Sequence, residues 1–219
     1  IVMAGNVATE SGGRRLIAAG ADILRVGVGP GSICTTRIIT GMGVPQVTAI
    51  AEAVKAVKGT NVTVVADGGI RQIGDMAKAL GMGAHAVMVG SLLAGFDESP
   101  GEKVVVDGVT YKQYRGMGSV GAMKRGSAER YGQARDTSDK KLIAEGVEGL
   151  VKYKGAARDY LDQVAGSLRS AFYYIGAKTV PEFRDTARFV RITPASMAES
   201  YPHSIAVVES GSNYEVVRH

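Results

Sequence analysis

Four short apolar runs, each followed by a helical pattern, most constrain the fold of this chain. They lie near residues 1–4, 23–28, 62–66 and 86–89 and are rich in Val, Ile and Ala. Each run is almost continuously apolar, which is typical of strands that are covered on both faces. Between them apolar residues recur at helical spacing, most clearly at Val47, Ile50, Ala51, Val54 and Val57. The sequence predicts successive β–α units and an α/β fold with a parallel sheet.

Composition limits the classes of partner. The 219 residues carry a net charge of +5, with basic residues scattered among 21 acidic ones and without Trp. A basic run with interleaved aromatic residues is absent from the sequence, so no nucleic-acid partner is expected. The longest uncharged apolar stretch, residues 84–96, is too short to span a bilayer, so no membrane partner is expected. One cysteine excludes an internal disulfide and predicts a reducing, cytoplasmic location. The chain starts at Ile1 without an initiator Met, which suggests a piece of a longer polypeptide.

The loop after the second run carries the cysteine. Residues 27–37 read Gly-Val-Gly-Pro-Gly-Ser-Ile-Cys-Thr-Thr-Arg. The glycines allow backbone N–H groups to approach an anion, and Cys34 places a nucleophile nearby. A free cysteine is often an inert core residue. Here the glycines and the hydroxyl groups favour a chemical role, because an inert core thiol needs neither.

Two glycine motifs follow the third and fourth runs, Asp67-Gly68-Gly69 and Gly90-Ser91. Backbone N–H groups bared by glycine, together with a helix N-terminus, suit a phosphate dianion. The hydroxyls of Ser32 and Tyr114 could add donors. The Asp67 carboxylate would repel phosphate, so we expect it to face a neutral diol such as a ribose. The alternative for Asp67 is a turn or helix-capping residue.

The segment 95–155 is a long polar and glycine-rich excursion. Residues 104–111 predict a hairpin that turns at Asp107-Gly108. Residues 119–146 show little apolar periodicity, which predicts a disordered segment or a functional lid. A helix near 156–175 follows, and a short helix and a strand between Pro181 and Ile192 precede the tail.

Four motifs in order carry a family resemblance: Gly27–Gln46, Ala66–Ile70, Val89–Gly95 and Tyr114–Ser119. Together they resemble the inosine-monophosphate (IMP) dehydrogenase and guanosine-monophosphate (GMP) reductase superfamily over nearly the whole chain. From pattern alone a doubly wound open sheet competes with a barrel. The resemblance implies a (β/α)8 TIM barrel, of which this chain supplies strands five to eight, a long flap and a C-terminal tail.

The resemblance also implies the organisation of the chain. Residues 1–94 form the second half of the barrel with the active-site loop 27–37. Residues 95–155 form the hairpin and mobile flap, and residues 156–219 the last barrel helix and the tail. The N-terminal half of the barrel is expected in the same or a separate chain, and the assembly is expected to be a homotetramer.

The activity that the resemblance implies is NAD-dependent oxidation of IMP to xanthosine monophosphate. Cys34 adds to C2 of the purine, hydride passes to NAD, and water hydrolyses the thioimidate with the help of Thr36. The resemblance assigns dinucleotide contacts to Gly27 and Gly29. It assigns nucleotide binding to a larger set, namely Ser32, Asp67, Gly69, Gly90, Ser91, Tyr114, Gly116, Met117, Gly118 and Glu145.

The pair Arg130-Tyr131 separates the two branches of the superfamily. In the dehydrogenases such a pair in the flap activates water, whereas the reductases have no hydrolysis step and lack the pair. The pair therefore favours the dehydrogenase branch over a solvated Arg-Tyr on a polar loop. GMP reductase stays the alternative enzyme, and a non-catalytic nucleotide-binding protein or inactive fragment is the alternative from another class.

A potassium ion is the last group that the resemblance implies. Its ligands are the carbonyls of Gly29, Gly31 and Cys34, completed from a neighbouring subunit by Glu199, Ser200 and Tyr201. Many family members have His where this chain has Tyr201. Because the ligands are expected to be backbone carbonyls, this difference should matter little.

Overall fold

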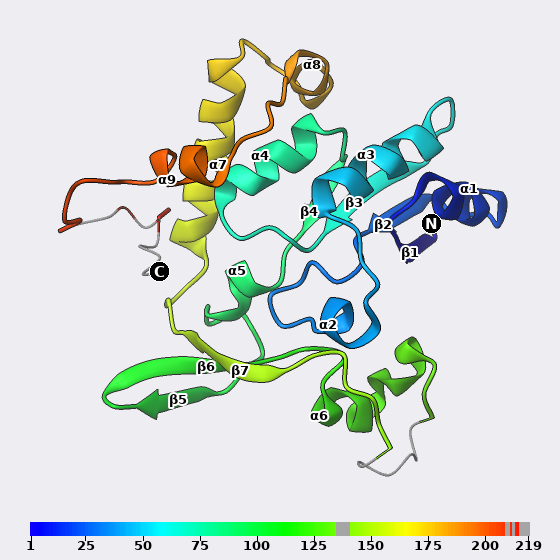
Figure 1. Cartoon of the computed structure of the whole chain (residues 1–219). Helices are drawn as coiled ribbons and strands as arrows, with labels where there is room; N and C mark the ends of the chain where they lie inside the picture. The colour runs from blue at the N-terminus through cyan, green and yellow to red at the C-terminus, as the bar shows by residue number, and fades with distance from the viewer. Residues whose placement is uncertain (135–140, 209–210, 212, 215–219) are drawn as a thin grey trace.

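A four-stranded parallel sheet forms the centre of the computed structural model, which describes residues 1–134, 141–208, 211 and 213–214 (Figure 1). The strands follow one another in chain order: β1 (Met3–Val7), β2 (Ile23–Val26), β3 (Thr63–Asp67) and β4 (Ala86–Met88). They are connected by α1 (Glu10–Ala18), α2 (Thr36–Thr40), α3 (Gln46–Val57) and α4 (Ile73–Gly81). The predicted α/β fold with successive β–α units is confirmed.

The first strand is longer than the sequence pattern indicated. The apolar run near residues 1–4 stops before Gly5 and Asn6, but both residues lie inside β1. The pairing continues from Gly5 opposite Arg25 to Val7 opposite Val26, with a shift of register between them. The irregularity lets the strand run on while it brings Asn6 toward the end of the sheet where the loops gather.

The main core lies between the sheet and α3, and most of the α3 side chains buried in it are small. Leu24, Val26 and Val64 of the sheet are fully buried. On α3 the buried positions are Ala49, Ile50, Ala53, Ala56 and Val57, whereas Val47 is 48% exposed. The buried face is therefore rotated from the predicted one. Alanines allow the helix to approach the sheet and α1 closely, so the small side chains rather than the largest ones face inward.

A second, antiparallel sheet contains β5 (Lys103–Val106), β6 (Val109–Arg115) and β7 (Glu148–Lys152). The predicted hairpin is confirmed. Asp107 and Gly108 both have positive φ, 49° and 77°, as a two-residue hairpin turn requires. The sequence analysis missed β7, because its partner β6 lies far away along the chain and its own pattern is weak.

The segment between β6 and β7 contains short helical turns: α6 (Val120–Ala122), η1 (Met123–Ser127) and η2 (Ala128–Tyr131). A small cluster of Met123, Ala128 and Leu142 holds them together. Positions 135–140 of the predicted flap lie outside the described residues.

The short helix α5 (Ser91–Ala94) follows β4 and precedes the second sheet. After the second sheet the C-terminal part contains three helices, α7 (Arg158–Tyr174), α8 (Val180–Thr186) and α9 (Pro194–Glu199). The strand predicted before Ile192 is wrong, since residues 187–193 form neither helix nor strand. Thr193 caps α9 and Pro194 begins it, which fixes a helix start there. Among the described residues, no helix has the length and apolarity to cross a membrane.

Leu24 tests the core, because its side chain is fully buried at the centre of the sheet. We expect Leu24→Ala to lower the free energy of unfolding by about 2–5 kcal/mol through lost burial and a cavity. Chemical denaturation of the full-length protein measures the change. Ile38→Ala is the control, because Ile38 is 81% exposed, and its effect should stay within about 0.5 kcal/mol. Equal losses in the two variants would contradict this description of the core.

Candidate functional site

The cysteine loop runs from the end of β2 into α2 and carries a short chain of side chains. Cys34 is half-buried, and its Sγ lies 3.2 Å from Thr36 Oγ1. Thr36 Oγ1 donates in turn to Glu145 Oε2 at 2.7 Å. Because the threonine hydrogen goes to the carboxylate, its oxygen is free to accept the thiol hydrogen. The three groups therefore form a path from the thiol to a carboxylate.

Glu145 reaches the loop because the end of the insertion pairs with it through the backbone. The Thr35 N–H donates to the Glu145 carbonyl at 2.9 Å, and the Val147 N–H donates to the Ile33 carbonyl at 3.0 Å. Cys34 and Gly146 form an isolated antiparallel bridge between these two hydrogen bonds. This pairing fixes the cysteine against the returning chain.

The predicted glycines of the insertion allow this close approach. A Cβ on Gly116 would lie 3.1 Å from the Ile33 carbonyl oxygen, and one on Gly118 would lie 2.9 Å from the Glu145 carbonyl carbon. Both glycines are buried, whereas Met117 between them is 52% exposed. Gly116 and Gly118 thus serve the packing of one backbone on another, and Met117 points outward.

Arg130 and Tyr131 lie in η2, and Tyr131 packs against Gly118, next to the Glu145 backbone. A Cβ on Gly118 would lie 3.0 Å from Tyr131 Oη, which places the phenol against the insertion backbone. Burial raises the pKa of Tyr131, the charges of Cys34 and Glu145 raise it further, and Arg130 opposes them. Arg130 Nη2 donates to Asn6 Oδ1 at 2.9 Å, which joins the insertion to β1.

Asp67 ends β3 and is bound by two side chains that the sequence analysis did not single out. Its Oδ2 accepts from Arg25 Nε and from Asn6 Nδ2, both at 2.8 Å. The carboxylate was expected to face a ribose; in this structure it forms an ion pair with Arg25 that is largely buried. A cation inside an apolar run was the sequence signal that could have found Arg25, whereas Asn6 lies beyond the apolar run near residues 1–4 and gave no signal.

Tyr114 lies against the Gly90-Ser91 motif. A Cβ on Gly90 would lie 2.8 Å from Tyr114 Oη, so the phenol approaches the backbone directly before Ser91. Tyr114 also shares a hydrogen bond with Ser32, which partly offsets the rise that burial and Asp67 cause in its pKa. The phenol therefore keeps its proton at neutral pH and can donate it to an anion. Gly69 has φ +73°, and a Cβ on it would lie 3.4 Å from Pro30 Cβ, so its backbone lies against the cysteine loop.

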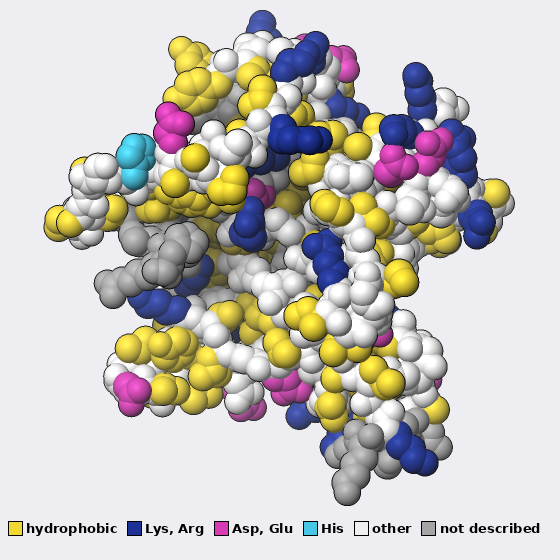
Figure 2. Space-filling model, in the orientation of Figure 1, with side chains coloured by type: hydrophobic (Ala, Val, Ile, Leu, Met, Phe, Trp, Pro, Cys, Tyr) yellow, Lys and Arg dark blue, Asp and Glu magenta, His cyan; other side chains and the backbone are white. Residues whose placement is uncertain are grey.

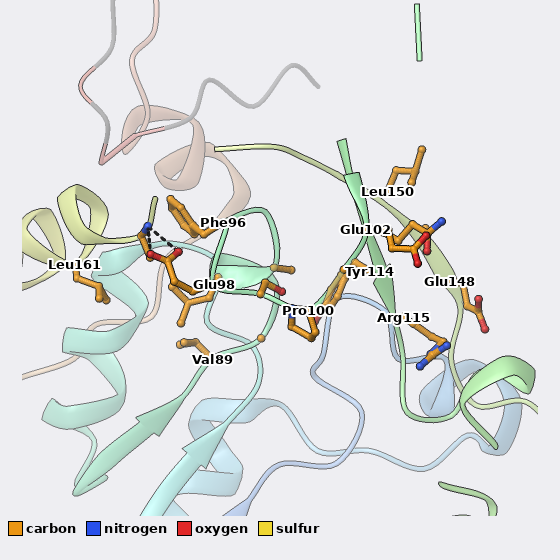
Figure 3. A pocket seen from close by; sticks show the side chains of 18 of the residues that line it. Val89, Phe96, Glu98, Pro100, Glu102, Tyr114, Arg115, Glu148, Leu150 and Leu161 are labelled. Atoms are coloured by element: carbon orange, nitrogen blue, oxygen red, sulfur yellow. Dashed lines mark hydrogen bonds between the residues drawn. The ribbon is translucent and has the colours of Figure 1, made fainter. Parts of the chain in front are cut away.

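A groove of about 1220 Å³ opens beside this cluster (Figure 3). Gly90, Tyr114 and Arg115 line it on one side and Phe96, Glu98 and Leu161 on another. Figure 3 shows the Glu98 carboxylate directed at the backbone of the α7 start, and Ala157 N–H donates to both of its oxygens. The sequence analysis missed this groove, because it lies between elements distant along the chain.

Packing within the chain accounts for Gly27 and Gly29, the two positions expected to contact a dinucleotide. A Cβ on Gly27 would lie 2.2 Å from the Asp67 carbonyl oxygen, and one on Gly29 would lie 2.6 Å from Arg37 Cγ. Both have positive φ, +141° and +76°. The fold of the loop therefore requires glycine at both positions, whether or not a ligand is present.

The expected cation ligands lie in two separate places. The Gly31 carbonyl already accepts from the Cys34 N–H at 3.1 Å. Glu199 ends α9, and Ser200 and Tyr201 follow it. The hydrogen bonds and ion pairs of the described residues do not connect residues 199–201 to the cysteine loop. Likewise, no group of three or more His, Cys, Asp or Glu side chains within the described residues could hold a metal ion.

The charged side chains form no single patch on the face shown in Figure 2. Lys and Arg lie over several parts of it, with hydrophobic side chains between them. Ligand binding at the site is therefore argued from the individual side chains described above and not from a charged surface.

Residues 1–203 match the family model described as IMP dehydrogenase / GMP reductase domain. The chain is 54% identical over 213 residues to inosine-5'-monophosphate dehydrogenase of Rhodopirellula baltica, covering 97% of this chain and 39% of that protein. It is 52% identical over 215 residues to the enzyme of the same name from Escherichia coli K12, covering 98% of this chain and 44% of that protein.

Among solved structures, a cysteine-to-alanine variant of GMP reductase from Trypanosoma brucei in complex with guanosine 5'-monophosphate is similar. Its TM-score is 0.84 at 44% identity, over 93% of this chain and 41% of that chain. The chain thus spans about two-fifths of the length of these relatives. Because the family model extends over all the motifs that build the site, the chain belongs to the IMP dehydrogenase / GMP reductase family.

Proposed function

We propose that this chain is the catalytic part of an NAD-dependent dehydrogenase that oxidises IMP to xanthosine monophosphate. One observation carries the proposal: the Cys34–Thr36–Glu145 chain lies beside Arg130-Tyr131. The relatives named inosine-5'-monophosphate dehydrogenase, at 52–54% identity, support it further.

The proposed reaction begins at the cysteine. The Cys34 thiol gives up its proton toward Thr36 and Glu145 while Sγ bonds to C2 of the purine. Hydride leaves C2 for the nicotinamide ring, so the purine is oxidised by two electrons and a thioimidate remains. Water then adds to C2, the C2–Sγ bond breaks, and the thiol is restored. The balance is one IMP, one NAD and one water consumed, with xanthosine monophosphate, NADH and one proton formed.

The residues around the cysteine suit the two parts of the nucleotide. Ser32, Tyr114, Gly69, Gly90 and Ser91 would bind the phosphate through hydroxyl and backbone N–H donors. Asp67 would bind the ribose through its carboxylate, whose position Arg25 and Asn6 fix. Gly116, Met117, Gly118 and Glu145 would border the purine. NAD, when bound, accepts the hydride, and Gly27 and Gly29 would leave room for it at the cysteine loop.

Arg130 and Tyr131 supply the argument for a dehydrogenase. We propose that they activate water after NADH leaves, with Thr36 and Glu145 receiving the proton. An arginine side chain stays protonated at neutral pH because its pKa exceeds about 12, so it cannot itself take a proton from water. The charge of Glu145 and the hydroxyls of Thr36 and Tyr131 must therefore share the task. A reductase has no use for this arrangement, since no water is added. Reduction of NAD with IMP tests the proposal; ammonia release from GMP with NADPH would assign the chain to the reductases instead.

Cys34→Ser should remove turnover and keep nucleotide binding, because oxygen is a far weaker nucleophile at neutral pH. We expect kcat to fall on the order of 10³-fold or more while the Kd for IMP changes little. Mass spectrometry of the trapped adduct checks the attachment site. Added mass on a peptide without Cys34 would refute the mechanism.

Arg130→Ala should slow hydrolysis more than hydride transfer, since the pair acts in the second step. We expect a rapid burst of NADH followed by turnover reduced about 10²–10⁴-fold, the usual contribution of a proton-transfer catalyst. Stopped-flow absorbance measures both phases. Lys141→Ala is the matched control, because Lys141 is an exposed cation of the same insertion. A burst slowed as much as the steady state would place Arg130 in the first step.

We also propose that the parallel sheet supplies strands five to eight of the barrel. By this assignment, residues 1–94 form its second half, 95–155 the hairpin and flap, and 156–219 the last helix and tail. The outer edges of β1 and β4 carry no strand partner within the described residues, and the relatives extend beyond the matched region. A first half of the barrel, in the same or a separate chain, would cover these edges, and a homotetramer in the cytoplasm is the proposed assembly.

The barrel assignment predicts how the isolated 219 residues behave. Unpaired edges and uncovered strand faces should make them self-associate or bind the missing half. Sedimentation equilibrium of the isolated chain, with and without the other half, measures this. A stable 22.8 kDa monomer with a cooperative melt and no partner would contradict the assignment of strands.

A potassium ion completes the proposal, held by carbonyls of Gly29, Gly31 and Cys34 and by Glu199, Ser200 and Tyr201 of a neighbouring subunit. We expect turnover in potassium to exceed that in sodium several-fold at matched ionic strength, since a fixed carbonyl cage discriminates by ion size. Glu199→Ala should weaken the dependence, and Glu182→Ala on α8 is the control. Equal rates in both salts would remove the cation from the site.

A further inference from the structure

Lys112 is a buried lysine that the proposed reaction does not use. It lies in β6 and is only 2% exposed. Its ammonium donates to three backbone carbonyls: Phe96 at 2.7 Å, Asp97 at 3.4 Å and, at a shorter distance, Ser99. A buried ammonium is costly unless its hydrogens are bonded. Here the turn 96–99 satisfies all three of them with oxygen atoms of one short segment.

The paired residue on β5 shows that this arrangement is not a general feature of the hairpin. Lys103 lies directly opposite Lys112 in the sheet. It is exposed, and it forms an ion pair with the Asp97 side chain at 2.7 Å. The two lysines thus bind the same turn in different ways, one through an exposed carboxylate and the other through buried carbonyls.

The turn that Lys112 holds comes directly after α5, and α5 begins at Gly90-Ser91. On β6, Tyr114 lies two residues beyond Lys112, so both side chains are on the same face of the strand. Tyr114 Oη is the group that approaches Gly90 and shares a hydrogen bond with Ser32. The Lys112 ammonium therefore fixes the separation between the element that carries Gly90 and the strand that carries Tyr114.

We infer that Lys112 is a positioning residue for phosphate binding. It holds β6 against the turn 96–99 so that the Tyr114 hydroxyl and the Gly90-Ser91 backbone face one anion together. The inference rests on the proposed function, because it assigns the phosphate of the nucleotide to Tyr114 and Gly90.

The test compares IMP with inosine, which lacks the phosphate, in binding to the full-length protein by calorimetry. Lys112→Met keeps the length of the side chain and removes the three donors. We expect the Kd for IMP to rise about tenfold, the effect of one hydrogen bond to a charged group, and the Kd for inosine to stay unchanged. Lys103→Met is the matched control and should alter neither constant. In a Tyr114→Phe background, Lys112→Met should add little, because both changes remove the same contact.

Three results would overturn the inference. An equal rise of both constants would make Lys112 a general structural residue, and an unchanged Kd for IMP would separate Lys112 from the phosphate. A wild-type protein that binds IMP no better than inosine would refute the proposed function and this inference together. If Lys112→Met does not fold, Lys112→Arg keeps a buried cation. Its wider guanidinium should separate the turn from β6 and lower the preference for IMP in the same way; an unaltered preference in that variant would also refute the inference.

Discussion

The backbone pairing between the cysteine loop and the end of the insertion is the constraint on which the site depends. Two hydrogen bonds, from Thr35 to Glu145 and from Val147 to Ile33, place these distant segments side by side. Only through them does Glu145 come within 2.7 Å of the Thr36 hydroxyl. The pairing requires glycine at 116, 118 and 146, where a Cβ would lie about 3 Å from the opposing backbone. A larger residue at any of these positions would push the two backbones apart and so move the Glu145 carboxylate away from Thr36.

A second network connects the insertion to the parallel sheet through side chains. Asn6 donates to Asp67 and accepts from Arg130, and Arg25 holds the same carboxylate. One amide therefore connects the flap arginine with the residue proposed to bind the ribose. Because an amide can donate and accept at once, Asn6 can hold an anion and a cation together, which neither a carboxylate nor a lysine could do. The position of the insertion is in this way coupled to Asp67, at the end of the site where we propose that the nucleotide binds.

The groove and the buried lysine belong to the other side of the same site. The turn 96–99 forms part of the groove wall and also binds the Lys112 ammonium. The second sheet is thus more than an excursion on the surface. The second sheet places Tyr114 beside the loops of the parallel sheet. Its strand β6 carries both Tyr114 and the buried Lys112, whose ammonium binds the turn 96–99.

The sequence by itself determined the β–α succession, the hairpin at Asp107-Gly108 and the cysteine loop, because each depends on local patterns of apolar residues or on turn chemistry. It also indicated the family through motifs in order. Tertiary structure decided the rest. The alanine face of α3, the strand β7, the irregular segment in place of a strand before Ile192, and the partners Asn6 and Arg25 of Asp67 all depend on neighbours distant along the chain. Such contacts leave no periodic signal in the residues that make them, so only the folded chain could show them.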